Sequence, residues 1–190
     1  MVEKAIAELE SLSKQGETYT NDQGSYGWRN PIRSDTGRIL QAVVAASAPK
    51  RMLEIGTAHG LSALYLIQGT DKQNCQLHTI EFDENVAGQS QELMDRLNLP
   101  VKVLAGEAMQ IIESLTGIYD LVFFDAQKSH YGKQIDFLWE RGLIGSQTVI
   151  LADNVLDRAD EVTDFIDWFK SRGINYTIIP TECGLLVSSL

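Results

Sequence analysis

Short apolar runs alternate with longer amphipathic stretches along most of this chain. After Lys50, the apolar runs lie at 51–56, 77–82, 101–106, 119–126, 148–154, 175–180 and 184–190. Stretches with apolar residues at helical spacing lie between them, at 61–69, 84–97, 108–115, 130–143 and 160–173. Continuous apolar runs of this length are typical of strands buried on both faces of a parallel sheet. The alternation with helices therefore predicts an α/β, doubly wound, Rossmann-like fold.

The two runs nearest the carboxyl terminus have a different connection. They are joined only by the segment Pro-Thr-Glu-Cys at 180–183, which is too short for a crossover helix. Parallel neighbours need a connection of a dozen residues or more, so these two strands are predicted to pair antiparallel as a hairpin.

The amino-terminal part is predicted to precede the sheet. Residues 3–14 form an amphipathic pattern typical of a helix, and the stretch 16–33, rich in Gly, Asn, Tyr and Trp, is interpreted as a loop. Ser34 or Asp35 can cap a following helix that ends before Pro49. With no internal repeat or linker, we expect a single domain over residues 1–190.

Composition and charge narrow the classes of function. The 190-residue chain is 44% hydrophobic and has a formal net charge of −10, which argues against binding a nucleic-acid backbone or an anionic membrane surface. No apolar run approaches the ~18 residues that cross a bilayer, and the first residues are amphipathic rather than signal-like, so we expect a cytoplasmic protein. Cys75 and Cys183 fall in stretches interpreted as strands and are expected to be buried thiols rather than a disulfide.

Acidic residues gather where the predicted strands end. In a parallel α/β sheet, the carboxyl ends of the strands meet at one edge, and ligands bind there. Four of the first five strand ends carry a carboxylate, and glycines occur at the same places: Glu54 with Gly56, Glu81, Gly106, Asp125, and Asp153 with Asn154. Four carboxylates at one edge repel each other unless something positive neutralises them.

The first two strand ends indicate a nucleoside site. Gly56 and Gly60 bracket a turn into a helix, where a backbone can approach a ligand closely, although their spacing is not that of a dinucleotide site. Glu81 lies about 20 residues further on, where a carboxylate can accept hydrogen bonds from ribose hydroxyls. A plain tight turn, and an acidic residue that favours the following helix, are the alternatives.

The fourth and fifth strand ends indicate a cation site. Asp125, Asp153 and Asn154 offer oxygen ligands that suit Mg²⁺, before Ca²⁺ or Mn²⁺, whereas no pair of histidines has the spacing of zinc ligands. Lys128 follows Asp125 on the same rim, where a lysine beside a cation can serve as a general base. Helix caps, turn formers and a solvated surface lysine are the corresponding structural alternatives.

Taken together, these motifs resemble the cation-dependent O-methyltransferases, the group that contains catechol and caffeoyl-coenzyme A O-methyltransferases. The resemblance covers about residues 30–190 and is carried by LEIGTAHGLSAL, HTIEFDE, FFDAQKSHY and LADNVL. Many methyltransferases share the first two segments, whereas the last two are specific in this order and separation. The resemblance implies a seven-stranded sheet whose last strand is antiparallel, and a homodimer.

The resemblance also implies roles for particular residues. A cofactor, S-adenosylmethionine, would contact Ile32, Glu54, Gly56, Ser62, Glu81, Gly106, Ala108 and Asp125. The divalent cation would be held by Asp125, Asp153 and Asn154, and Lys128 would be the catalytic base. The implied reaction is methylation of a hydroxyl of a small molecule with vicinal hydroxyls, either a catechol-like phenol or a diol on a sugar or natural-product scaffold.

Departures from the family pattern leave the acceptor open. Ala58 replaces a glycine or aromatic residue of the first motif, Gln127 replaces an aspartate of plant relatives, and Thr177 and Cys183 replace acidic residues near the carboxyl terminus. Catechol or caffeoyl-coenzyme A therefore does not follow as the substrate. The amino-terminal loop with Tyr26, Trp28 and Arg29 is interpreted either as a lid over the acceptor or as a structural or dimer contact.

Three other functions share part of the pattern. A nicotinamide-dependent oxidoreductase has the strand, turn and acidic second strand, but it needs a closer glycine spacing and no Asp-Asn pair. A non-catalytic module would hold the cofactor without turnover. A metal-independent methyltransferase acting on nitrogen or carbon would have no use for Asp125 and Asp153-Asn154.

Overall fold

A mixed sheet runs through the centre of the molecule and carries the site at one edge. The computed structural model describes residues 1–15, 19–21, 24–26 and 31–190. The seven-stranded sheet has the order β5-β4-β3-β6-β7-β9-β8. Its strands are β3 (Arg51–Ile55), β4 (Gln76–Glu81), β5 (Val101–Ala105), β6 (Leu121–Phe124), β7 (Val149–Ala152), β8 (Tyr176–Ile179) and β9 (Leu185–Ser189).

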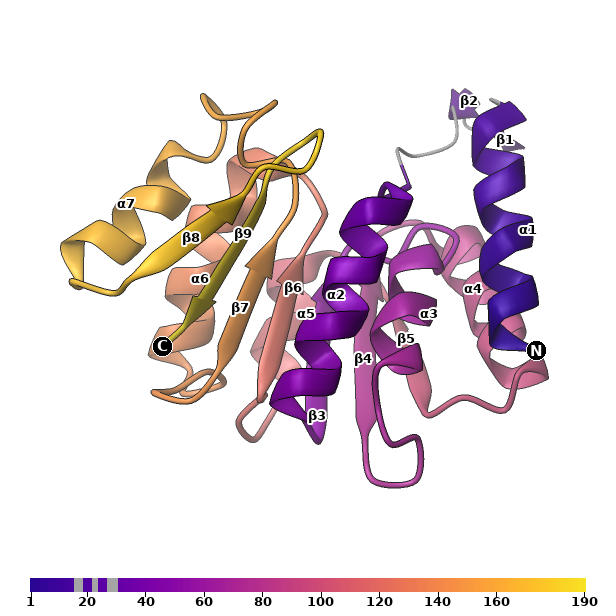
Figure 1. The fold of residues 1–190 in the computed structure, drawn as a ribbon, viewed down its shortest axis with the longest axis horizontal. Coiled ribbons are helices and arrows are strands. Elements are labelled where there is room, and N and C mark those ends of the chain that lie inside the picture. Colours follow the sequence, from indigo (N-terminus) through magenta and orange to yellow (C-terminus); the bar gives the residue numbers. More distant parts are fainter. Residues whose placement is uncertain (16–18, 22–23, 27–30) are drawn as a thin grey trace.

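Helices cover both faces of this sheet (Figure 1). One face packs against α1 (Val2–Gln15), α2 (Ser34–Ser47), α3 (Leu61–Gln68) and α4 (Glu84–Arg96), through an apolar cluster that includes the fully buried Leu40 and Leu64. The other face packs against α5 (Ala108–Ser114), α6 (Tyr131–Glu140) and α7 (Thr163–Ser171), through a second cluster that includes the fully buried Ile135 and Phe165. Strands covered on both sides explain the continuous apolar runs in the sequence.

The direction of each strand confirms the predicted fold. β3 pairs parallel with both β4 and β6, and β4–β5 and β6–β7 are also parallel. The last strand, β9, runs antiparallel to β7 and to β8, with which it forms the predicted hairpin. The carboxyl ends of β3 to β7 therefore meet at one edge, uppermost in Figure 1.

The predictions for the amino-terminal part were wrong in two details. The stretch expected to be a loop contains two short strands, β1 (Tyr19–Asn21) and β2 (Gly24–Tyr26), which pair antiparallel. The N-cap position of helix α2 is Arg33, whose side chain makes no capping hydrogen bond, rather than Ser34 or Asp35. These two residues already lie in the first turn of the helix, where the carboxylate of Asp35 accepts a hydrogen bond from the next backbone N–H.

The cysteines also differ from expectation. Both are free thiols, as predicted, but Cys75 precedes β4 and Cys183 lies in the turn before β9, so neither lies within a strand and both are only half-buried. Of the predicted lid residues, Tyr26 is described by its backbone alone, and Trp28 and Arg29 lie outside the described residues. None of the helices described is long and apolar enough to span a bilayer.

Candidate active site

A cavity of about 500 Å³ opens at the carboxyl edge of the sheet. Most of the residues implied by the family resemblance line it: Ile32, Gly56, Ser62, Glu81, Gly106, Ala108, Asp125 and Lys128. Glu54, Asp153 and Asn154 do not line it. The cavity follows the ends of β5, β4, β3 and β6, which are adjacent in the sheet. Ligand pockets for small molecules commonly have a volume of this size.

The turn between β3 and α3 brings two loops into close contact. Gly56 has a φ of +108°, and a Cβ added there would lie 2.7 Å from the backbone carbonyl of Asp125. Only glycine therefore allows the β3 and β6 loops to approach in this way. Ala58 follows in the left-handed region, with a φ of 44°, and its backbone N–H donates to Glu81 Oε2 at 2.9 Å.

Glu81 is held in a fixed orientation at the end of β4. It is 4% exposed, its Oε2 accepts from the Ala58 N–H, and its Oε1 accepts from the Asp83 N–H at 3.0 Å. A carboxylate oxygen can accept more than one hydrogen bond, so both oxygens can also receive hydroxyl groups of a ligand in the cavity.

Glu54 lies beneath the cavity rather than in its wall. Its side chain is fully buried, and the Thr79 hydroxyl donates to its Oε2 at 2.5 Å. Within the described parts of the chain its Oε1 has no hydrogen-bond partner of standard geometry, although the hydroxyl of Ser62 lies close enough to lower the pKa of Glu54. Burial dominates and raises the pKa of Glu54 to about 8. Glu54 therefore lies behind Ser62, whereas the resemblance implied a direct contact with a cofactor.

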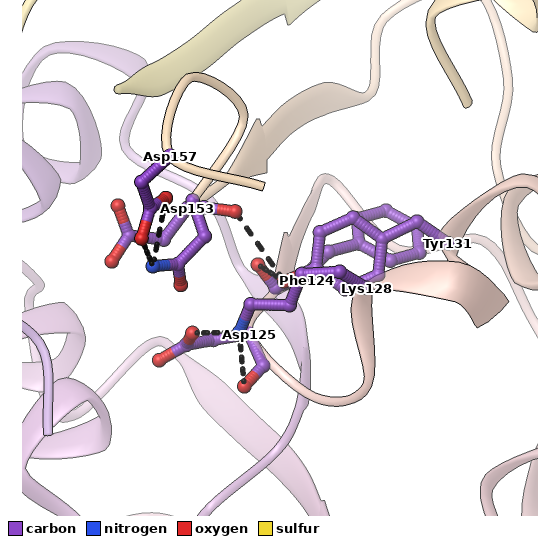
Figure 2. A network of polar contacts seen from close by, with 7 residues as sticks. Phe124, Asp125, Lys128, Tyr131, Asp153 and Asp157 are labelled. Atoms are coloured by element: carbon purple, nitrogen blue, oxygen red, sulfur yellow. Dashed lines mark hydrogen bonds and ion pairs between the residues drawn. The ribbon is translucent and has the colours of Figure 1, made fainter. Parts of the chain in front are cut away.

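Asp125 and Asp153 form the acidic centre of the site (Figure 2). They follow β6 and β7 directly, and these two strands are neighbours. Lys128 Nζ donates to Asp125 Oδ1 at 3.0 Å, and this ion pair is largely buried, with 16% and 11% of the two side chains exposed. Asp153 is 3% exposed, and its Oδ1 has no hydrogen-bond partner among the residues that the structure describes.

The electrostatics of this pair are unfavourable for two negative charges. Burial raises the pKa of Asp125 to about 6, and Lys128 opposes this effect. Burial, followed by the charge of Asp125, raises the pKa of Asp153 to about 7. Removing water from a carboxylate and placing a second carboxylate nearby both favour the protonated form, so a positive charge at this place would be stabilised.

Asp157 is a third acidic residue of the site that the sequence reasoning missed. Asn154 has a φ of 65°, and its amide Nδ2 donates to the two carboxylate oxygens of Asp157 at 3.2 and 3.1 Å. This orientation leaves the amide oxygen of Asn154 available to a ligand. Asp157 also raises the pKa of Asp125 and of Asp153. Its position three residues after Asn154, in the turn that leaves β7, was the available signal.

Tyr131 is a second residue that the sequence did not reveal as part of the site. It is fully buried at the start of α6, and its hydroxyl donates to the backbone oxygen of Phe124 at 3.0 Å and lies 3.5 Å from that of Asp153. Figure 2 shows this side chain at the ends of β6 and β7. Burial raises the pKa of Tyr131 well above its ordinary value, so the hydroxyl stays protonated and can donate.

The predicted cation ligands follow the neighbouring strands β6 and β7, but they include only two acidic side chains. Within the described part of the chain, no three His, Cys, Asp or Glu side chains form a group that could hold a metal ion. The predicted site uses two carboxylates and one amide oxygen, and the ammonium group of Lys128 already contacts one of the carboxylates.

An ion pair joins the segment on the amino-terminal side of the cavity to the turn between β8 and β9. Ile32 lines the cavity and is 6% exposed. The next residue, Arg33, forms an exposed ion pair with Glu182, whose carboxylate lies 2.6 Å from the guanidinium. The segment before α2 and the turn before β9 therefore meet beside the site.

Comparison with known proteins identifies the family. The chain is 32% identical over 131 residues to a catechol O-methyltransferase of Niastella koreensis, covering 66% of this chain and 58% of that protein. It is 27% identical over 150 residues to an O-methyltransferase of Aspergillus hancockii, covering 78% and 56%. The chain thus spans a little over half of the length of these curated relatives.

Solved structures show the same fold. An O-methyltransferase from Bacillus cereus aligns with a TM-score of 0.80 over 98% of this chain and 90% of that chain, at 21% identity. Residues 6–173 match the model of the O-methyltransferase family. The match extends over most of the chain, and the chain therefore belongs to the O-methyltransferase family.

Proposed function

We propose that this protein transfers the methyl group of S-adenosylmethionine to a hydroxyl oxygen of a small molecule with vicinal hydroxyls, and that a divalent cation assists. The observation that carries this proposal is the position of Asp125 and Asp153. They lie at adjacent strand ends, and Asp125 with its partner Lys128 lines a cavity large enough for a nucleoside. A methyl donor in the cavity and an acceptor at the carboxylates would be neighbours.

The residues in the cavity fit the proposed cofactor. Glu81 presents a fixed carboxylate for ribose hydroxyls, and the β3–α3 turn offers the close backbone approach that Gly56 permits. The related structures from Bacillus cereus and Streptomyces achromogenes are complexes with SAH and SAM respectively. When bound, S-adenosylmethionine supplies an electrophilic methyl group. The chain's task is to orient it and to keep water away from it.

The residues at the strand ends fit a divalent cation. The buried Asp153 Oδ1 lacks a partner among the described residues, and burial raises the pKa of Asp125 and of Asp153 although Lys128 opposes this effect, so a further positive charge is favourable there. Asp125, Asp153 and the amide oxygen of Asn154 would hold the ion, which is most suitably Mg²⁺. A bound divalent cation lowers the pKa of a hydroxyl that it contacts.

Lys128 is the proposed base. Its amine lies 3.0 Å from Asp125 Oδ1 and lines the cavity, so it can reach a hydroxyl placed beside the carboxylates. To act as a base, the amine must first release its own proton to solvent; it would then accept the proton of the acceptor hydroxyl, and the carboxylate of Asp125 would stabilise the ammonium that forms again. The resulting oxyanion is then oriented toward the methyl group by the walls of the cavity.

The acceptor is proposed by class. Several relatives are named catechol O-methyltransferase, which favours a phenol with adjacent hydroxyls. Thr177 is exposed on β8 and does not line the cavity, and Cys183 is a half-buried thiol beside the acidic residues. Neither provides the acidic side chain expected from the family, so a diol on a sugar or natural-product scaffold satisfies the same chemistry.

One observation favours a second candidate, methyl transfer without a metal. The ammonium group of Lys128 already compensates Asp125, and a lysine can stabilise an acceptor oxyanion by itself. This candidate differs from the first in one measurable respect, because it does not require a divalent cation.

A methyl-transfer screen with labelled S-adenosylmethionine separates these candidates. Catechols, flavonoids and sugar diols are tested as acceptors, with Mg²⁺ and with a chelator. We expect transfer to at least one vicinal diol in Mg²⁺ and none in chelator. Transfer that is equal in chelator supports the second candidate, and binding of S-adenosylmethionine without transfer to any acceptor contradicts both.

A further inference from the structure

A buried amide at the cavity is not used in the proposed reaction. Gln134 lies on α6, is 1% exposed and lines the cavity. Its Oε1 has no hydrogen-bond partner in the described part of the chain. A buried amide oxygen without a partner is unfavourable, and most such groups in proteins are paired. An unpaired acceptor beside a cavity therefore indicates a ligand group that donates to it.

Gln134 lies on α6, and two neighbouring features place this helix between the β5 and β6 loops. Helix α6 contacts α5, whose first residue, Ala108, lines the same cavity. Asp125 and Lys128, where the reaction is proposed, follow β6. The strand order β5-β4-β3-β6 places Glu81, at the end of β4, between these two places.

This arrangement sets the direction of a bound nucleoside, if the proposed function holds. The reacting methyl group belongs beside Lys128 and the ribose at Glu81, so the base extends past Glu81 toward Ala108 and Gln134. Adenine carries one exocyclic amine, which is a hydrogen-bond donor. We infer that the Oε1 of Gln134 accepts a hydrogen bond from the exocyclic amine of the adenine, and that it selects the cofactor by this contact.

Two other residues of the cavity wall have different roles. A carboxylate oxygen of Glu107 already accepts the backbone N–H of Gln110 at 3.0 Å and caps α5. Phe82 lines the cavity and is 71% exposed, so it offers an aromatic surface to the base but no acceptor. Without Gln134, the amine of a base in this position would lose its water without gaining a partner.

Calorimetric titration with two ligands tests this contact. The ligands are S-adenosylhomocysteine and its purine analogue that lacks the 6-amino group. We expect the wild-type protein to bind the analogue about 10-fold more weakly, because one hydrogen bond is lost. In Gln134→Met, which keeps the side-chain length but has no acceptor, the ratio of the two affinities should fall to about 1. This comparison isolates the coupling between amide and amine, since a general distortion would weaken both ligands alike.

The controls separate this inference from the proposed function. Lys133→Met changes an exposed residue of the same helix and should keep the wild-type ratio. Gln134→Leu replaces Gln134→Met if circular dichroism shows that the latter does not fold. An unchanged ratio in the apolar variant, or a wild-type protein that binds both ligands equally, overturns the role of Gln134 alone. A wild-type protein that binds neither ligand overturns this inference together with the proposed cofactor.

Discussion

Two buried acidic residues at the site differ in what surrounds them. Asp153 follows β7, close enough to Asp125 for the two charges to interact, and would be neutralised by the proposed cation, whereas Glu54 lies within β3 next to Ser62. The nearest partners of Glu54 are hydroxyl groups, which hydrogen-bond to it but do not neutralise it. At the scale of single residues, no positive charge in the described part of the chain therefore offsets the burial of Glu54, whereas a cation would offset that of Asp153. The stability of the protein should depend on pH through Glu54.

Glu54→Gln should change how stability depends on pH. The pKa of Glu54 is about 8 in the folded protein and 4.5 ordinarily, so the unfolded chain loses this proton first. The free energy of unfolding contributed by this group therefore falls as pH rises from about 4.5 to about 8. Urea denaturation should show little difference between wild type and variant at pH 4 and a variant more stable by about 5 kcal/mol at pH 9.

The exposed Glu92 provides the control for that measurement. Glu92 lies on the surface of α4. In Glu92→Gln, the change in the free energy of unfolding between pH 4 and pH 9 should equal that of the wild type. A Glu54→Gln protein that is less stable than wild type at pH 9 by the same amount as at pH 4 would show that Glu54 does not carry the pH dependence.

Lys128→Met should affect the chemical step more than binding. The amine contacts Asp125 and is proposed to remove the acceptor proton, and the loss of such a base commonly lowers kcat by about 10²–10⁴-fold. KM should change by less than about 10-fold. Steady-state kinetics with an acceptor found in the screen measures both. Lys133→Met is the matched control, and a Lys128→Met enzyme with the kcat of this control would remove the proposed role.

At the scale of elements, the β3–α3 turn and the start of α6 place the site. Gly56 lets the loop after β3 pack against the loop after β6. The hydroxyl of Tyr131 contacts backbone oxygens at the ends of both β6 and β7. The first contact involves the backbone of Asp125, and the second involves the backbone oxygens of Phe124 and Asp153. The separation of the two carboxylates is thus set by local packing and not only by the strand order.

Gly56→Ala should disrupt this packing. The new Cβ would lie 2.7 Å from backbone atoms of Asp125, and the φ of +108° is unfavourable for alanine. We expect a loss of about 2 kcal/mol or more in the free energy of unfolding, together with weaker binding of S-adenosylhomocysteine. Denaturation and calorimetry measure the two effects.

The same substitution at Gly88 should stabilise the protein, in contrast to Gly56→Ala. It lies in α4, is exposed, and a Cβ there would meet nothing within 4 Å. Gly88→Ala should therefore raise the free energy of unfolding by about 1 kcal/mol through helix propensity and leave ligand binding unchanged. If Gly56→Ala behaved like Gly88→Ala, the contact between the β3 and β6 loops would have no role in the site.

At the scale of the whole molecule, the sequence predicted the architecture better than the details of the site. The strands were predictable because burial on both faces requires continuous apolar runs, and the hairpin was predictable because the segment 180–183 is short. Most of the implied cofactor residues line the cavity because strand ends meet at one edge of such a sheet.

Other features depended on contacts that are distant in the sequence. In the sequence, Tyr131 cannot be distinguished from any aromatic residue at the start of a helix. Its role depends on the contact of its hydroxyl with the backbone at the ends of β6 and β7, which only the folded structure shows. Gln134 is an ordinary polar residue in the sequence, and its burial beside the cavity appears only when α6 packs on the sheet. Glu54 belongs to a recognisable motif, but its place behind Ser62 depends on the contact with Thr79 on the neighbouring strand.

The central claim is that Asp125 and Asp153 hold a divalent cation beside the cavity, and titration of Mn²⁺, followed by its electron paramagnetic resonance signal, tests it without relying on turnover. The wild-type protein should bind one Mn²⁺ per chain in competition with Mg²⁺. Asp153→Ala should weaken this affinity by about 100-fold or more while still binding S-adenosylhomocysteine. Equal Mn²⁺ affinity in the two proteins would contradict the account.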